Sequence, residues 1–287
     1  MLIPRYYQKL DKYLEPNKVL VIYGPRQVGK TTLLKNYLTD SKLKYKFDTG
    51  DNIRTQHILG SQDFSQILSY TSNYELLVID EAQRIPHVGM GLKIIVDQVP
   101  NIKVIATGSS SFELSGQIGE PLTGRKKTLI MYPVSQIELT ALSNKYELKE
   151  NLSEYLIFGS LPAVLTAKTK ESKISLLEEI VDSYLIKDIL ELEYVKSSKI
   201  IVDLLRLLAF QIGNEVSLTE LAKQLGVDYK TVARYLDLME KSFIIYNLRG
   251  FSRNLRKEIT KKSKYYFYDN GIRNAIILNY NSLDLRD

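Results

Sequence analysis

The segment Gly24–Thr31, with the sequence GPRQVGKT, has the residue types and spacing of a phosphate-binding loop, or P-loop. Its glycines permit a tight backbone, and main-chain N–H groups at the start of a following helix attract phosphate. We expect Lys30 to reach the β and γ phosphates of a nucleotide and Thr31 to bind Mg²⁺. A purely structural turn would need neither the lysine nor the hydroxyl. The predicted nucleotide-binding residues are Gly24, Pro25, Arg26, Gln27, Val28, Gly29, Lys30, Thr31 and Thr32.

Two acids, Asp80 and Glu81, end the apolar run that begins at Leu76. We expect Asp80 to hold Mg²⁺ through water and Glu81 to polarise a water for attack on the γ phosphate. The alternative is an ordinary solvated helix start. Because the P-loop lies about 50 residues earlier, the pair favours hydrolysis over simple binding.

Two further positions could touch the γ phosphate. Thr107 or Ser109, after the next apolar run, could act as a sensor of that phosphate, and the sequence does not choose between them. A serine here could equally cap a helix. Arg125 is a candidate catalytic arginine that contacts the γ phosphate within the chain or across a subunit boundary, and its alternative is a surface position. The guanine-reading sequence Asn-Lys-x-Asp is absent, so we expect adenine as the base.

Short apolar runs that alternate with amphipathic segments must position these residues. Such alternation predicts an α/β fold with a parallel sheet. The five expected strands are Val19–Tyr23, Lys44–Asp48, Leu76–Ile79, Ile102–Ala106 and Leu129–Tyr132.

From about Asn151 the strand pattern disappears and long helical spacings take over, as in Ile201, Leu204, Leu205 and Leu208. This change predicts a domain boundary near residue 145. We expect a P-loop domain at 1–145, a helical lid or linker at 146–212 and a third domain at 213–287.

The third domain has the signature of a helix-turn-helix. Ser217 and Asp228 are expected to cap two short helices, with Gly226 ending the first. The run Phe243–Leu248 would add a strand and complete a winged helix. Its outward residues, Tyr229, Lys230 and Arg234, would face the major groove if the domain binds DNA, although such a domain can also pack as a lid or partner surface.

The net charge of +6 has a local origin. Residues 249–264 hold seven basic side chains against Glu258, an excess equal to that of the whole chain. Beside a helix-turn-helix, such a basic hairpin could bind the DNA backbone, whereas a solvated loop is the alternative. The candidate DNA contacts are Tyr229, Lys230, Arg234, Arg253, Arg256, Lys261 and Lys262.

Composition excludes several other kinds of site. The 287 residues include no cysteine, which excludes disulfides and thiolate chemistry, and His57 and His87 cannot form a helical metal-ligand pair. No apolar run has the length of a signal peptide or a membrane span. We therefore expect a cytoplasmic protein without a membrane partner.

Taken together, these motifs resemble the archaeal and bacterial AAA+ ATPases in which a P-loop domain precedes a domain of unknown function (DUF4143 type) that contains a winged helix. The resemblance spans nearly the whole chain. It rests on Gly24–Thr31, Asp80–Gln83, Thr107–Ser110, Gly124–Arg125, Tyr155–Pro162, Gln211–Asn214 and Tyr266–Gly271.

The resemblance implies an α/β fold in which the P-loop strand is central in a parallel five-stranded sheet, followed by a helical region and a winged helix-turn-helix domain. It also implies ATP hydrolysis at Lys30, Asp80 and Glu81. Family members usually continue into a nuclease-like domain, whereas this sequence stops 16 residues after Gly271, so we expect either a shortened member or a fragment of one. Expected cofactors are ATP or ADP and Mg²⁺, and expected partners are DNA, a homo-oligomer or another protein.

Three hypotheses about function follow. The leading one is a Mg²⁺-dependent ATPase whose γ-phosphate contacts switch the P-loop domain relative to the winged helix. The second is a DNA-binding regulator in which the nucleotide is structural. The third is an interaction module that binds ADP without turnover.

Overall fold

The structure is a computed structural model that describes residues 2–108, 119–182, 198–251, 253 and 262–286. Contacts divide the chain into two compact units. One unit contains residues 4–132, and the other contains residues 133–287 together with residues 1–3. The chain therefore passes between the units twice, after residue 3 and after residue 132.

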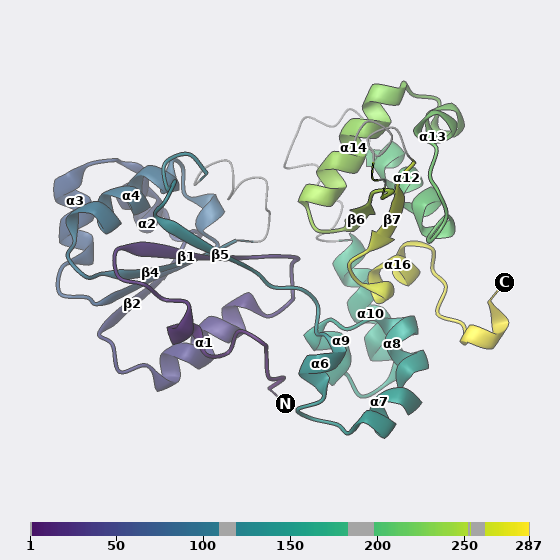
Figure 1. The fold of residues 1–287 in the computed structure, drawn as a ribbon, viewed down its shortest axis with the longest axis horizontal. Helices are drawn as coiled ribbons and strands as arrows, with labels where there is room; N and C mark the ends of the chain where they lie inside the picture. Colours follow the sequence, from purple (N-terminus) through teal and green to yellow (C-terminus); the bar gives the residue numbers. More distant parts are fainter. Residues whose placement is uncertain (1, 109–118, 183–197, 252, 254–261, 287) are drawn as a thin grey trace. The chain divides into compact units, whose positions relative to one another are not determined.

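The first unit contains the five predicted strands in one parallel sheet (Figure 1). Its strand order is β2 (Tyr45–Thr49), β3 (Leu76–Asp80), β4 (Lys103–Gly108), β1 (Lys18–Tyr23) and β5 (Lys126–Ile130). Val21 of β1 lies opposite Ala106 on one side and Thr128 on the other. Because the strands are parallel, their carboxyl ends meet at one edge of the sheet, where the P-loop follows β1 and Asp80 ends β3.

Two expectations about this sheet are corrected. The P-loop strand β1 is not central, since β4 holds the middle place and β1 lies between β4 and the edge strand β5. Strand β5 also begins three residues earlier than predicted and ends before Met131. An edge strand needs no continuous apolar run, and the lysines at 126 and 127 are half-buried in it, which hid its start from a hydrophobicity pattern.

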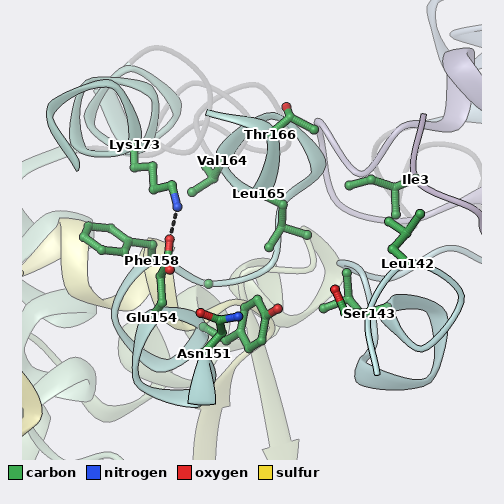
Figure 2. A pocket seen from close by; sticks show the side chains of 13 residues that line it. Ile3, Leu142, Ser143, Asn151, Glu154, Phe158, Val164, Leu165, Thr166 and Lys173 are labelled. Carbon is green, nitrogen blue, oxygen red and sulfur yellow. Dashed lines mark hydrogen bonds and ion pairs between the residues drawn. The ribbon is translucent and has the colours of Figure 1, made fainter. Parts of the chain in front are cut away.

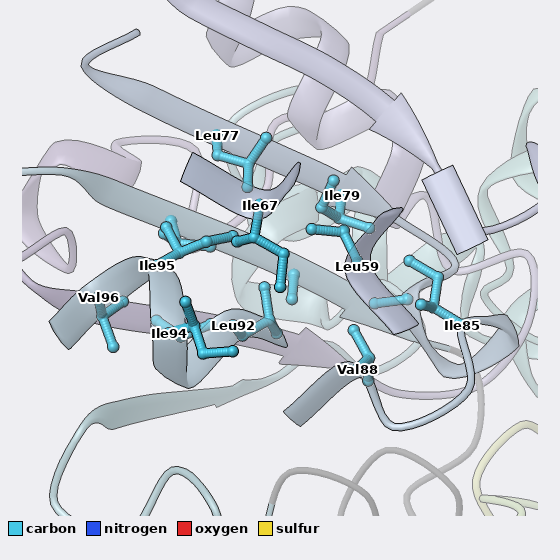
Figure 3. Packing of buried hydrophobic residues seen from close by; sticks show 14 of the residues in the cluster. Leu59, Ile67, Leu77, Ile79, Ile85, Val88, Leu92, Ile94, Ile95 and Val96 are labelled. Carbon is cyan, nitrogen blue, oxygen red and sulfur yellow. The ribbon is translucent and has the colours of Figure 1, made fainter. Parts of the chain in front are cut away.

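Helices cover both faces of the sheet, with α1 on one side and α2, α3 and α4 on the other (Figure 1). Figure 3 shows how Leu59, Ile67 and Leu92 from this second set pack over Leu77 and Ile79 of β3. Full burial of each such side chain stabilises the fold by roughly 1.5–3 kcal/mol. The helical segments are η1 (Leu10–Lys12), α1 (Lys30–Asp40), α2 (Ile53–Gly60), α3 (Phe64–Thr71), η2 (Ala82–Arg84) and α4 (Val88–Gln98).

The second unit is mainly helical and carries one short antiparallel strand pair. Its first described helices are α6 (Gln136–Leu139), α7 (Lys145–Glu150), α8 (Leu152–Phe158), α9 (Pro162–Thr166) and α10 (Lys170–Ile180). Its later described elements are α12 (Ser198–Phe210), α13 (Leu218–Leu225), α14 (Tyr229–Lys241), β6 (Ile245–Leu248), β7 (Lys264–Phe267), α16 (Asn270–Ile276) and η4 (Leu283–Leu285).

The predicted pair of short helices is present as α13 and α14. Ser217 accepts from the Glu220 N–H at 3.4 Å, Gly226 ends α13 in a left-handed conformation, and Asp228 accepts from the Thr231 N–H at 2.9 Å. Strand β6 follows α14 and pairs with β7, and Val216 forms a bridge with Ser263. The strand starts at Ile245 rather than at Phe243, which lies in the turn with a positive φ of 56°.

The expected domain boundaries differ from the division in the structure. The first unit ends at residue 132 because Val134, Leu139 and Leu148 already pack with Ile3 in the second unit. Residues 146–212 and 213–287 also form one unit, since α16 packs on α8, α10 and α12. These contacts join residues far apart in the chain, so no local pattern reveals them.

None of the helices in the described ranges is long and apolar enough to cross a membrane.

Candidate active site

The P-loop joins strand β1 to helix α1, as the motif predicts. Gly24 is required at its start, because a Cβ there would lie 2.0 Å from the main-chain oxygen of Met131. Gln27 has a positive φ of 59° at the tip of the loop, and Gly29 caps α1. The first N–H groups of a helix have no acceptor within the helix, so this end of α1 suits a phosphate group.

Lys30 is the first residue of α1 and is buried. Its Nζ donates to the main-chain oxygens of Gly24 at 2.9 Å and Pro25 at 2.7 Å. The ammonium is thus held inside the loop, where its charge favours an anion.

Asp80 ends strand β3 and faces the second residue of α1. The Thr31 hydroxyl donates to Asp80 Oδ2 at 2.7 Å, although 49 residues separate the two in the chain. A hydroxyl and a carboxylate are hard oxygen donors of the kind that Mg²⁺ prefers. The pair therefore fits the predicted role of Thr31 and Asp80 as metal ligands.

Thr107, in strand β4, occupies the other oxygen of the same carboxylate. Its hydroxyl donates to Asp80 Oδ1 and accepts from the Glu81 N–H at 3.2 Å, and its side chain is fully buried. The structure thus brings one of the two sensor candidates into contact with the Asp80 carboxylate and the Glu81 main chain. The other, Ser109, lies outside the described residues.

Glu81 follows in a left-handed conformation, with φ 49° and ψ 41°. Such backbone geometry is costly for a residue with a side chain and is common at functional sites. Gln83 Nε2 donates to Glu81 Oε2 at 2.5 Å across the short η2 turn and so orients this carboxylate. The motif Asp80–Gln83 contains this glutamine, but the spacing alone did not predict its contact.

Arg125 is not brought to this site. It precedes β5, and its main-chain oxygen accepts from the Val19 N–H near the start of β1. Gly24, the first residue of the P-loop, comes five positions after Val19 along the strand, or about 16 Å away. The Arg125 Nε pairs instead with Asp97 at 2.5 Å. A γ-phosphate contact of Arg125, within this chain or with another copy, therefore stays a prediction.

The candidate DNA contacts lie in the second unit. Tyr229, Lys230 and Arg234 are exposed on α14, and the Arg234 guanidinium lies 5.3 Å from the ring centre of Tyr235. Arg253 and Lys262 are also exposed. Arg256 and Lys261 lie outside the described residues.

Two polar side chains of α16 and its cap join distant parts of the second unit. Asp269 accepts from the Ser160 N–H at 2.7 Å, and burial raises the pKa of this carboxyl while the backbone donors oppose that shift. Asn274 Nδ2 donates to the oxygens of Leu156 and Ile157. Gly159 is required here because a Cβ would collide with the Asp269 carboxylate. The motifs Tyr155–Pro162 and Tyr266–Gly271 therefore meet in a structural contact.

The second unit also holds a cavity of about 200 Å³ that no motif predicted (Figure 2). Phe158 and Val164 form part of its apolar lining, and Lys173 pairs with Glu154 at its side. The Lys173 ammonium also lies 5.6 Å from the ring centre of Phe158. Because the two charges compensate one another, this pair adds no net charge to the cavity.

Family models match both halves of the chain. Residues 16–140 match one described as an AAA domain, and residues 149–283 match one described as a domain of unknown function (DUF8612). The first match contains the P-loop, both acids and Thr107. The second match is to DUF8612, whereas the sequence resemblance named a domain of the DUF4143 type.

Uncharacterized proteins from Haemophilus influenzae and Mycobacterium tuberculosis are 28% and 27% identical to the chain. The alignments cover 95% and 94% of this chain, and 72% and 58% of the respective relatives. The chain thus spans less than two thirds of the mycobacterial relative. A crystal structure of a signal transduction ATPase with numerous domains and a tetratricopeptide repeat sensor, from Pyrococcus horikoshii, aligns with 96% of this chain and 42% of its own, at 13% identity and a TM-score of 0.39.

Proposed function

We propose that this chain binds ATP with Mg²⁺ at the P-loop and hydrolyses it to ADP and phosphate. The observation that carries the proposal is the Asp80 carboxylate, which accepts from Thr31 on one oxygen and from Thr107 on the other, beside Glu81. This arrangement supports a metal-binding role for Thr31 and Asp80 and a general-base role for Glu81 beside the P-loop. The AAA-domain match over residues 16–140 supports the same reading.

Each residue has a role in the proposed reaction. Lys30 and the start of α1 bind the β and γ phosphates and stabilise their negative charge. Glu81, oriented by Gln83, accepts a proton from water as the water oxygen bonds to the γ phosphorus and the bond to the β-phosphate oxygen breaks. Thr31 and Asp80 would hold Mg²⁺, which neutralises phosphate charge when bound.

The variant Glu81→Gln tests this proposal, because an amide cannot take up the proton. We expect ATP turnover to fall by about 100-fold or more while the nucleotide Kd stays within a few-fold. Radiolabelled ATP hydrolysis and equilibrium binding measure the two effects. Glu120→Gln is the control, since Glu120 is exposed in the same unit. Unchanged turnover in Glu81→Gln would remove Glu81 from the mechanism.

The same experiment separates hydrolysis from a structural nucleotide. If the purified chain retains ADP through gel filtration and does not hydrolyse ATP, the nucleotide has a structural role. If both wild type and Glu81→Gln bind no nucleotide, the proposed function is wrong.

The proposal includes a conformational switch. The γ phosphate proposed to bind at Lys30 would lie at the carboxyl edge of the sheet, where Thr107 would sense it through Asp80, and this phosphate is lost in the reaction. A state with ATP and a state with ADP therefore differ in their contacts, which is the requirement for a nucleotide-dependent change between the two units.

A second candidate function is DNA binding by a winged helix formed by α13, α14 and the strands β6 and β7. The exposed side chains of Tyr229, Lys230 and Arg234 on α14 favour it, because the second helix of such a motif enters the major groove. The basic side chains of Arg253 and Lys262 are exposed in the segment between the two strands. This segment would contact backbone phosphates.

The salt dependence of duplex binding tests this function. Neutralising Arg253, Arg256, Lys261 and Lys262 together should reduce the slope of log affinity against log salt by up to about 3.6, at roughly 0.9 per phosphate contact. The control neutralises four exposed lysines elsewhere, Lys35, Lys42, Lys149 and Lys168. No detectable binding of wild type to duplex at low salt, with and without ATP, would exclude the function.

A further inference from the structure

Arg5 is a buried arginine beside the P-loop, with an exposed fraction of 9%. Its Nη1 donates to the main-chain oxygen of Val28, and its Nη2 donates to the main-chain oxygen of Tyr132 at 2.5 Å. These two oxygens are 104 residues apart in the chain. One guanidinium therefore joins two segments that lie far apart in the sequence.

The two oxygens belong to the P-loop and to the end of the first unit. Val28 is in the P-loop, between Gln27 and Gly29, and is completely buried. Tyr132 is the last residue of the first unit before the chain passes into the second. The segment that leaves the unit also touches the start of the P-loop, because the Met131 N–H donates to the Tyr23 oxygen at 2.8 Å.

Arg5 itself lies two residues after the other passage between the units. Residue Ile3 belongs to the second unit, where it packs with Val134, Leu139 and Leu148. Arg5 belongs to the first unit. The clamp formed by Arg5 therefore connects the P-loop to both places at which the chain changes units.

The chemistry of the side chain suits this task. A guanidinium presents donors in a rigid planar fork, so it fixes two acceptors in a definite relative position, which a flexible lysine does not. Its positive charge is fixed and partly removed from water next to a loop that would bind phosphates. Opposite charges attract more strongly in such surroundings, so phosphate in the loop and the clamp should stabilise one another.

We propose that Arg5 is a positioning residue that clamps the P-loop to the two segments joining the units, so that phosphate in the loop fixes those segments. This inference rests on the proposed nucleotide switch and names the residue that transmits it. Arg5 acts through Val28 and Tyr132 and has no part in the chemical step. A merely structural arginine would affect stability without changing the response to nucleotide.

The test measures the response of the two units to nucleotide in the full chain. Because the chain has no cysteine, the exposed residues Lys35 and Glu150 can be replaced by cysteine and labelled with a dye pair, one in each unit. The Glu81→Gln background prevents turnover. Energy transfer between the dyes is recorded with and without saturating ATP and Mg²⁺, and ATP binding is measured separately.

Three variants of Arg5 are compared with a matched control. Arg5→Ala and Arg5→Gln should lose at least half of the nucleotide-dependent change in energy transfer and raise the ATP Kd about tenfold, while Arg5→Lys should restore part of the change. The control is Arg273→Ala in the second unit. Arg273 also donates twice to a main-chain oxygen, that of Ala209, at 2.9 and 2.7 Å. This variant should lower stability and keep the full change.

The outcomes are distinguishable. A full change in Arg5→Ala, or in Arg5→Gln where the alanine variant does not fold, would overturn the inference. A wild type that binds ATP without any change in energy transfer would also overturn it, while leaving nucleotide binding intact. A wild type that binds no ATP would refute the proposed function itself, and the inference with it.

Discussion

At the level of single side chains, Asp80 connects three elements of the candidate site. Thr31 reaches it from α1 and Thr107 from β4, and each hydroxyl takes a different carboxylate oxygen. The Glu81 N–H donates to the Thr107 hydroxyl as well. A change in the hydrogen bonds of Asp80 would therefore also shift the main chain of Glu81.

Gln83 offers a prediction at this scale. Its side chain holds Glu81 Oε2 at 2.5 Å, so Gln83→Ala should leave the carboxylate less well oriented. We expect kcat for ATP hydrolysis to fall about tenfold, with the nucleotide Kd nearly unchanged. Steady-state kinetics and equilibrium binding measure these quantities.

Gln66→Ala is the matched control for this prediction, because Gln66 is exposed on α3. It should leave kcat at the wild-type value. If Gln83→Ala instead weakened nucleotide binding with kcat unchanged, Gln83 would have no orienting role.

The residues that could be predicted from the sequence are those whose partners follow from local pattern. The P-loop and Asp80 each come directly after an apolar run, so their placement at one edge of a parallel sheet follows from the strands. The contacts of Arg5 and the place of Arg125 depend on which strands are neighbours and in which register. No spacing in one sequence contains that information.

At the level of elements, α16 donates hydrogen bonds to the last turns of two other helices. Asn274 Nδ2 donates at 3.0 and 2.7 Å to oxygens in the last turn of α8, and Arg273 donates to an oxygen in the last turn of α12. The last carbonyls of a helix have no partner within it. Helix α16 thus satisfies acceptors on two helices at once.

The variant Asn274→Ala tests this role. It removes, from a buried position, the two hydrogen bonds to α8 and the two that Asn274 Oδ1 accepts from Arg273 and Arg286, and we expect the free energy of unfolding to fall by about 2–3 kcal/mol. Urea unfolding followed by circular dichroism measures the change. The exposed Asn36→Ala should stay within about 0.5 kcal/mol of wild type. An unchanged unfolding free energy in Asn274→Ala would show that these bonds do not stabilise the unit.

Among the elements, caps were more predictable than sheet edges. Ser217, Gly226 and Asp228 mark the ends of α13 and α14 because each acts on backbone groups within a few residues. The predicted bounds of strand β5 were wrong because its pairing with β1 defines the strand, whereas its first side chains are largely polar.

At the level of the whole molecule, the second unit contains residues that precede the first unit in the sequence and residues that follow it. Ile3 packs with residues that follow position 132, and α16 packs on α8. A boundary inferred from the change in hydrophobic period falls near residue 145, where the helical pattern becomes regular. The division into compact units at residue 132 depends instead on contacts that span more than 100 residues, which hydrophobic period does not report.

The passage of residues 1–3 into the second unit also affects how the protein is made on the ribosome. The partners of Ile3 extend to Leu148, and synthesis at about 5–20 residues per second separates them by roughly 7–30 s. The intervening residues 4–132 form a unit of their own and are complete earlier. Ile3 therefore lacks its packing partners while the sheet assembles. This apolar side chain thus stays accessible to chaperones for longer than the residues that follow it.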